Sequence, residues 1–161
     1  MKSKLTWTKG LFTSLYQIYS NGKQLGNLID KPFSRTIKGT FNDKEYLFRN
    51  SGFFTQYTEI VDCSDNKVIG GIEYNSWRSK ATVSVNGIKY IWKYDNLWST
   101  QWSLSNSDGI SVRFNSSITK GQINVNTDDG LLVLSGLFVK NYYLQTAFVV
   151  ILVAVIIPAI G

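Results

Sequence analysis

The chain has 161 residues, a formal charge of +6, one cysteine and no histidine. A chain of this length accommodates one domain around a single core. Without histidine it lacks the commonest general base and metal ligand, and a single cysteine excludes a disulfide framework within the chain. We therefore expect a protein that is not an enzyme, with no catalytic residues, no metal site and no cofactor.

Residues 1–130 consist of short runs in which apolar and polar side chains alternate. The turn signals Asn21-Gly22, Asn86-Gly87 and Asp108-Gly109 separate several of these runs, and such pairs are strong signals for a β-hairpin. The third pair lies between Trp102–Leu104 and a run that begins at Ile110. The runs predict roughly eleven or twelve strands at intervals of about ten residues, a pattern typical of a sandwich or a barrel.

An internal repeat favours the barrel. At a shift of 44 residues, segments 21–28 and 42–49 align without a gap on segments 65–72 and 86–93. A four-stranded unit of about 40–45 residues also describes a propeller blade, but a propeller needs at least about four blades. Because closing one sheet on itself removes its edges, we predict a mainly β fold, a closed antiparallel barrel of about 11–12 strands.

The C-terminal tail, residues 131–161, contains a single charged side chain, Lys140. A more polar stretch from Lys140 to Thr146 divides this tail, and we expect two pieces. The first, an apolar helix from about 129 to 143, has no polar face, so it must be buried in protein or in lipid. Its length of about 20 Å matches strands of six to eight residues, which predicts a central hydrophobic helix inside the barrel.

The second piece, from about Leu144 to Ile160, predicts a C-terminal transmembrane helix, because about 20 apolar residues span a bilayer. The expected domains are therefore residues 1–143, the barrel with its central helix, and residues 144–161, the membrane-spanning segment. Lys140, Tyr142 and Tyr143 would then lie at the membrane interface. The alternative is that the whole tail packs into or against a soluble barrel.

Three features predict that the barrel faces the cytoplasm on a single-pass C-terminal anchor. The N-terminus contains no apolar stretch of the kind found in secretory signals. A single cysteine fits a reducing compartment. All the basic residues precede the span, as the positive-inside rule requires of a cytoplasmic segment.

Basic side chains beside aromatic ones are candidates for binding an anionic lipid surface. Lys89 and Lys93 alternate with Tyr90 and Trp92, and Arg78 follows a tryptophan. The same mixture is found in platforms for single-stranded nucleic acid. A barrel, however, needs core aromatics alternating with outward lysines for its own folding, so we expect membrane lipid as a partner and no nucleic acid.

Three segments carry a resemblance to a known family: Tyr16–Leu28, Ile60–Asp62 with its turn into Lys67–Ile72, and the helix at 129–139. Together they resemble the Tubby C-terminal-like superfamily, which includes phospholipid scramblases and LURP-one-related proteins. The resemblance implies a twelve-stranded barrel around a central hydrophobic helix. Scramblase-like members carry an acidic calcium-binding segment near the helix, whereas residues 138–143 here contain no carboxylate. Calcium-triggered lipid transfer is therefore not implied.

These features predict a non-enzymatic, membrane-anchored β-barrel module. We expect it to act as an accessory subunit or scaffold beside integral membrane proteins, or as a lipid-surface binding domain. The alternative is a soluble barrel that binds a lipid or another apolar ligand, with its whole tail buried in the fold.

Overall fold

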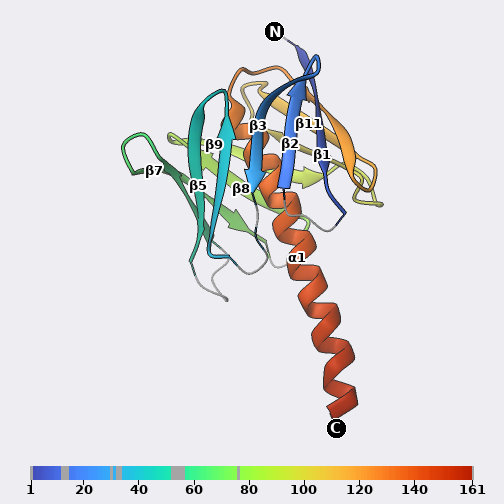
Figure 1. Cartoon of the computed structure of the whole chain (residues 1–161). Coiled ribbons are helices and arrows are strands. Elements are labelled where there is room, and N and C mark those ends of the chain that lie inside the picture. The colour runs from blue at the N-terminus through green and yellow to red at the C-terminus, as the bar shows by residue number, and fades with distance from the viewer. Residues whose placement is uncertain are drawn as a thin grey trace.

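The computed structural model describes residues 2–11, 15–29, 31, 34–51, 57–75 and 77–160. Twelve antiparallel strands form a closed barrel in which each strand pairs with its neighbours in sequence and β1 pairs with β12 (Figure 1). The predicted fold class is confirmed. The elements are β1 (Ser3–Lys9), β2 (Leu15–Ser20), β3 (Lys23–Ile29), β4 (Thr36–Phe41), β5 (Lys44–Asn50), β6 (Tyr57–Asp62), β7 (Lys67–Tyr74), β8 (Lys80–Val85), β9 (Ile88–Tyr94), β10 (Gln101–Ser105), β11 (Ser111–Ser116), β12 (Lys120–Val125) and α1 (Gly130–Ile160).

The Asn-Gly pairs form the tight turns that the sequence predicts. Asn21 and Gly22 have φ angles of 49° and 79°, and Asn86 and Gly87 have φ angles of 49° and 81°. A two-residue hairpin of type I′ requires positive φ at both positions, and these residue types tolerate it best. Each pair joins two strands with no further loop residues.

The turn at Asp108-Gly109 is longer than the sequence suggested. The side chain of Asn106 accepts hydrogen bonds from the amides of Asp108 and Ile110, at 3.1 and 3.0 Å. These bonds between a side chain and the backbone compete with strand pairing. As a result the connection covers residues 106–110, and β11 begins at Ser111 instead of at Ile110.

The internal repeat is visible in the structure. At the same shift of 44 residues, β4 coincides with β8 and β5 with β9, from the first residue to the last. Gly26 and Gly70 occupy equivalent positions, where an added Cβ would lie 2.3 Å from the carbonyl oxygen of Thr40 and 1.9 Å from that of Ser84. Thr40 and Ser84 are also 44 residues apart, so both units contain the same close backbone approach, which only glycine permits.

Helix α1 is continuous, and the polar stretch that the sequence places between two pieces does not interrupt it. The change at this stretch is in burial. Side chains from Leu131 to Asn141 and that of Tyr143 are buried inside the barrel, whereas exposed side chains begin at Leu144. The amide of Leu131 donates to the carboxylate of Asp129 at 3.0 Å, which caps the start of the helix.

The buried half of α1 makes specific contacts with the strands around it. The indole nitrogens of Trp92 and Trp102 both donate to the carbonyl oxygen of Gly136, at 3.0 and 3.1 Å. On another side of the helix, Phe138 stacks on Phe48 with ring centroids 4.5 Å apart. The first half of the helix therefore packs with the strands into one core inside the barrel.

Replacing Leu134 with aspartate is expected to prevent folding. This side chain is fully buried among the strands, and an unpaired carboxylate in such a site costs several kcal/mol, against a total stability of about 5–15 kcal/mol. Near-UV circular dichroism and thermal unfolding measure the loss. Leu97→Asp changes a fully exposed leucine in the same way and should leave both signals unchanged. A Leu134→Asp protein with native dichroism would contradict an enclosed helix.

Candidate membrane-facing end of the barrel

The two ends of the barrel differ in chemistry. We call the end where α1 begins the entry end; it contains the turns that follow the even-numbered strands. The opposite end, from which α1 leaves the barrel, is the exit end, where the odd-numbered strands end and the even-numbered strands begin (Figure 1). The C-terminal half of α1 extends away from the exit end of the barrel (Figure 1).

Beyond Gln145 and Thr146, the projecting half of α1 is apolar on every side. Leu144, Phe148 and Ile151 are 48, 59 and 61% exposed, and the residues between and beyond them are nearly all aliphatic. By length and composition the helix Gly130–Pro158 is able to cross a bilayer. Monomeric soluble proteins rarely expose a contiguous apolar surface of this kind. Such a surface is therefore a candidate for contact with lipid or with another protein.

Lys140, predicted to lie at the membrane interface, is placed in the mouth of the barrel at the exit end. It is only 8% exposed, and its ammonium group donates to the carbonyl oxygen of Ser99 at 2.7 Å. The same group lies 4.7 Å from the ring centroid of Tyr94 and 5.3 Å from that of Trp102. Burial lowers the pKa of Lys140 to about 8, because charge is poorly solvated there.

The two other predicted interface residues close the same mouth. The hydroxyl of Tyr143 donates to the carbonyl oxygen of Lys80. Tyr142 stacks on Tyr74 with ring centroids 4.0 Å apart. Both rings therefore face the strands of the barrel at the level where the helix leaves it.

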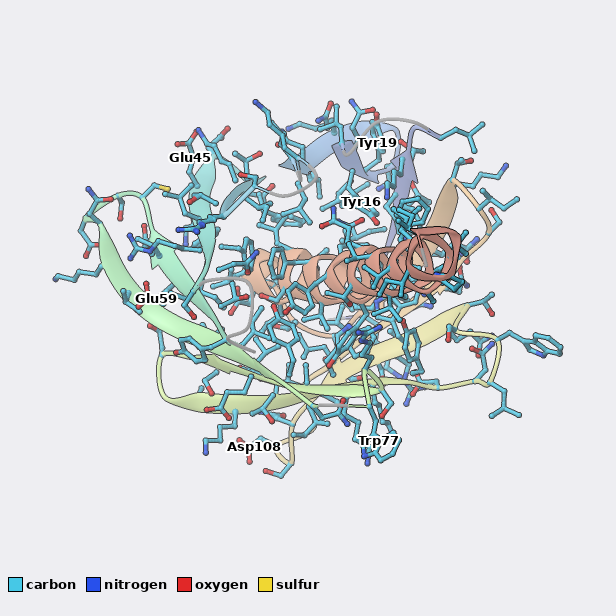
Figure 2. The ribbon with its side chains drawn as sticks, turned by 90° about the horizontal axis from the view of Figure 1, so that it is seen from below. Tyr16, Tyr19, Glu45, Glu59, Trp77 and Asp108 are labelled. Atoms are coloured by element: carbon cyan, nitrogen blue, oxygen red, sulfur yellow. The ribbon has the colours of Figure 1, made fainter. Side chains whose placement is uncertain are left out.

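A second polar cluster lies in the mouth, against β1 and β2. Asn141 accepts hydrogen bonds from the ammonium group of Lys9 and the hydroxyl of Tyr16, both at 3.0 Å. Figure 2 looks at the exit end and shows Tyr16 between its strand and the helix. Together with Lys140 and Tyr143, these groups form a polar collar between the apolar core and the apolar projecting helix.

The residues predicted to bind lipid lie at different ends. Arg78 is in the β7–β8 loop at the exit end, and Lys93 is next to the last residue of β9, at the same end. Lys89 is the second residue of β9 and therefore lies at the entry end. The structure brings Arg78 and Lys93 to the helix-exit side and separates Lys89 from them.

Exposed apolar loop residues at the exit end were missed by the sequence reasoning. We call them the rim: Leu11, Trp77, Leu97, Trp98 and Ile118. They are 70 to 100% exposed. Figure 2 shows Trp77 outside the ring of strands. Their position in the sequence was the signal that could have identified them. These large apolar side chains lie beside turn residues and outside the alternating runs, which indicates exposed loops.

The entry end has a shallow, polar pocket of about 440 Å³ beside the start of α1. Asp62, Asp128 and Asp129 contribute to its lining. Hydrogen bonds from Ser64 lower the pKa of Asp62, which fits a structural turn. Nearby, burial raises the pKa of the Cys63 thiol, which disfavours the nucleophilic thiolate. In the part of the chain that the structure describes, no three His, Cys, Asp or Glu side chains could hold a metal ion.

Comparisons of the chain with protein-family models, with curated proteins and with solved structures find no match.

The stability of the protein is expected to rise between about pH 8 and pH 10. The pKa of Lys140 is about 8 in the folded state and 10.5 in the unfolded state. Between these values the unfolded state binds more protons than the folded state, so the free energy of unfolding increases as pH rises. The gain is at most roughly 3 kcal/mol. Chemical unfolding of the full chain in a mild detergent measures it. Above pH 10 the trend reverses, because burial keeps Tyr143 neutral while unfolded tyrosines ionise.

Lys140→Met should flatten this profile, since it removes the titrating group but keeps an unbranched side chain. Lys89→Met, at an exposed position on the barrel surface, should leave the rise intact. A wild-type profile that is flat from pH 8 to pH 10 would contradict a buried ammonium group in the mouth.

Proposed function

We propose that this protein is a non-enzymatic, membrane-anchored β-barrel module whose projecting helix crosses the bilayer. In this proposal the barrel stands at the cytoplasmic surface and acts as an accessory subunit or scaffold for integral membrane proteins, with the lipid surface as its immediate neighbour. One observation carries the proposal: a single uninterrupted helix forms the core of the barrel and then continues as an exposed apolar rod.

This arrangement favours an anchor over the soluble alternative. A soluble barrel would have to fold its tail back over the strands, but α1 projects away from them (Figure 1). The buried half of α1 also occupies the interior, where a lipid or another apolar ligand would bind. Both features speak against an apolar-ligand carrier and leave the bilayer as the natural environment of the projecting half.

The direct continuation of the helix also fits a scaffold. No flexible linker separates the core from the apolar segment, so the barrel cannot rotate independently of the span. The entry end, with its polar turns and acidic side chains, then points away from the membrane. A module held in this way presents one fixed face to neighbouring proteins.

We further propose that the chain belongs with the Tubby C-terminal-like superfamily. The support is architectural: that resemblance implies twelve strands around a central hydrophobic helix, and this chain has twelve strands closed around the first half of α1. The calcium-dependent chemistry of scramblases is outside the proposal, because residues 138–143 carry no carboxylate.

The anchor is tested by membrane fractionation with alkaline carbonate extraction. The full chain is expected to stay in the membrane pellet. A chain that ends at Tyr143 should be soluble and folded, because the contacts of the core and of the polar collar described above end at this residue. If the full chain is soluble without detergent and the shortened chain unfolds, the projecting half belongs to the barrel and the anchor is wrong.

The scaffold role is tested by the native mass of the full chain, purified in a mild detergent from its own membranes. We expect a mass above that of the monomer in its micelle. A matched chain with residues 144–160 replaced by an unrelated apolar span separates contacts made by the helix from contacts made by the barrel. A monomeric mass for the unaltered chain would contradict a stable accessory subunit.

A further inference from the structure

We propose that the rim, Leu11, Trp77, Leu97, Trp98 and Ile118, is a second membrane contact that seats the exit end of the barrel on an anionic lipid leaflet. The proposal rests on the proposed function, because it takes the projecting half of α1 as the span. It adds a lipid-binding surface, made by loops, to an anchor made by a helix.

The exposure of the rim residues is the first argument. Leu97 is 100% exposed, Trp77 and Ile118 are each 87% exposed, and Trp98 is 85% exposed. The other three tryptophans, Trp7, Trp92 and Trp102, are buried. Two tryptophans in water make no contribution to the core, whereas tryptophan is enriched where proteins meet the headgroup region of a bilayer.

The second argument is that the rim occupies one end of the barrel. Its residues come from the β1–β2, β7–β8, β9–β10 and β11–β12 loops, all of which lie at the exit end. The entry end has the opposite composition. Its two-residue turns 21–22, 42–43 and 86–87 consist of Asn, Asp and Gly, and its longer turns 63–66 and 106–110 also contain Ser, Cys and Ile. The apolar loop residues therefore lie at the end where the helix leaves, on one side of it.

The third argument is the absence of a spacer. Burial inside the barrel ends at Tyr143, and Leu144 is already 48% exposed. One turn of helix rises about 5.4 Å, so the apolar surface of α1 starts within a turn of the barrel mouth. If Leu144 and Phe148 are in hydrocarbon, the loops beside them reach the interfacial region of the bilayer.

The fourth argument is charge. Lys80 and Lys93 are directly paired across β8 and β9, and both are exposed. Like charges at such positions repel each other, and in the described part of the chain neither forms a salt bridge. Arg78, Lys31 and Lys120 also lie at the exit end. Acidic lipid headgroups would neutralise these cations, and this attraction extends about 8 Å at physiological ionic strength.

The full chain, reconstituted in phosphatidylcholine vesicles with about one-third phosphatidylglycerol, provides the test. Lipids brominated near the headgroup end of their acyl chains quench tryptophan at short range. We expect strong quenching, since Trp77 and Trp98 are exposed and the other tryptophans are enclosed. The double variant Trp77→Phe, Trp98→Phe should lose most of it. In that background Ile88→Trp, at the entry end, should stay unquenched.

A reporter in the span separates this proposal from the one it rests on. Phe148→Trp, in the same double-variant background, should be quenched by lipids brominated deep in the acyl chain. If this reporter is quenched while Trp77 and Trp98 are not, the anchor stands and rim docking is overturned. If neither is quenched, the chain is not in the bilayer and both proposals fail.

The charge requirement is tested with two lysines on one strand. Lys93→Gln should lower the ratio of docked to undocked barrel about fivefold, as expected for the loss of one cation at an anionic surface. Lys89→Gln, at the other end of β9, should have no effect. Equal quenching of Trp77 and Trp98 in pure phosphatidylcholine would overturn the anionic specificity. Quenching that appears only after a protein partner is added would overturn the lipid leaflet as the occupant.

Discussion

Enclosure of the first half of α1 by the strands is the constraint on which the rest of the structure depends. A closed sheet of twelve strands needs side chains to fill its interior, and the strands here supply only part of them. The helix supplies the rest, and the two indole groups that donate to Gly136 hold it against β9 and β10. An added Cβ at Gly136 would lie 2.2 Å from the ring of Phe114 on β11, so the helix also fits closely against the strand next to β10.

The same helix then leaves the barrel without a break, and by length and composition it is able to cross a bilayer. A hydrogen-bonded α-helix tolerates both environments, because its backbone groups are satisfied within the helix. The surroundings of the side chains differ between the two halves of the helix. Lys140, Asn141 and Tyr143 find partners on the barrel, and the residues from Ala147 onward are apolar. The polar stretch in the tail therefore seals the mouth of the barrel.

Much of the barrel could be predicted from local chemistry. Asn21-Gly22 and Asn86-Gly87 fix two hairpins through their φ angles, and the 44-residue repeat follows from equivalent glycines, Gly26 and Gly70. The extra length of the turn at Asp108 could not be predicted, because it depends on hydrogen bonds of the Asn106 side chain. Local signals work where the conformation of one or two residues decides the structure.

The candidate site was predicted less completely, because it depends on which end of the barrel each residue occupies and on which strands surround the helix. Lys89 and Lys93 lie on one face of β9, but a rise of about 3.4 Å per residue separates them by about 14 Å along the strand. The alternation of polar and apolar residues identifies the face of a strand on which a side chain lies, but it does not identify the end of the barrel. Lys140 carries charge in an apolar tail, which suggested an interface. The sequence contains no signal that Ser99 and Tyr94 would enclose its ammonium group.

The repeat provides an internal comparison for the basic exit end. Arg49 and Lys93 are equivalent, being 44 residues apart on β5 and β9. Arg49 pairs with Glu59 on the next strand at 2.9 Å, whereas the residue equivalent to Glu59, opposite Lys93, is Ser103. Folding of the barrel is therefore compatible with a neutralised cation at this position. In the second unit no carboxylate occupies the position equivalent to Glu59, where Ser103 instead donates a hydrogen bond to Asp95 at 2.9 Å. Lys93, which forms no salt bridge among the described residues, lies in the unit that also carries Trp77 and Trp98, so charge and apolar exposure coincide on one side of the exit end. A bilayer with acidic headgroups satisfies both at once, which neither water nor a purely apolar partner does.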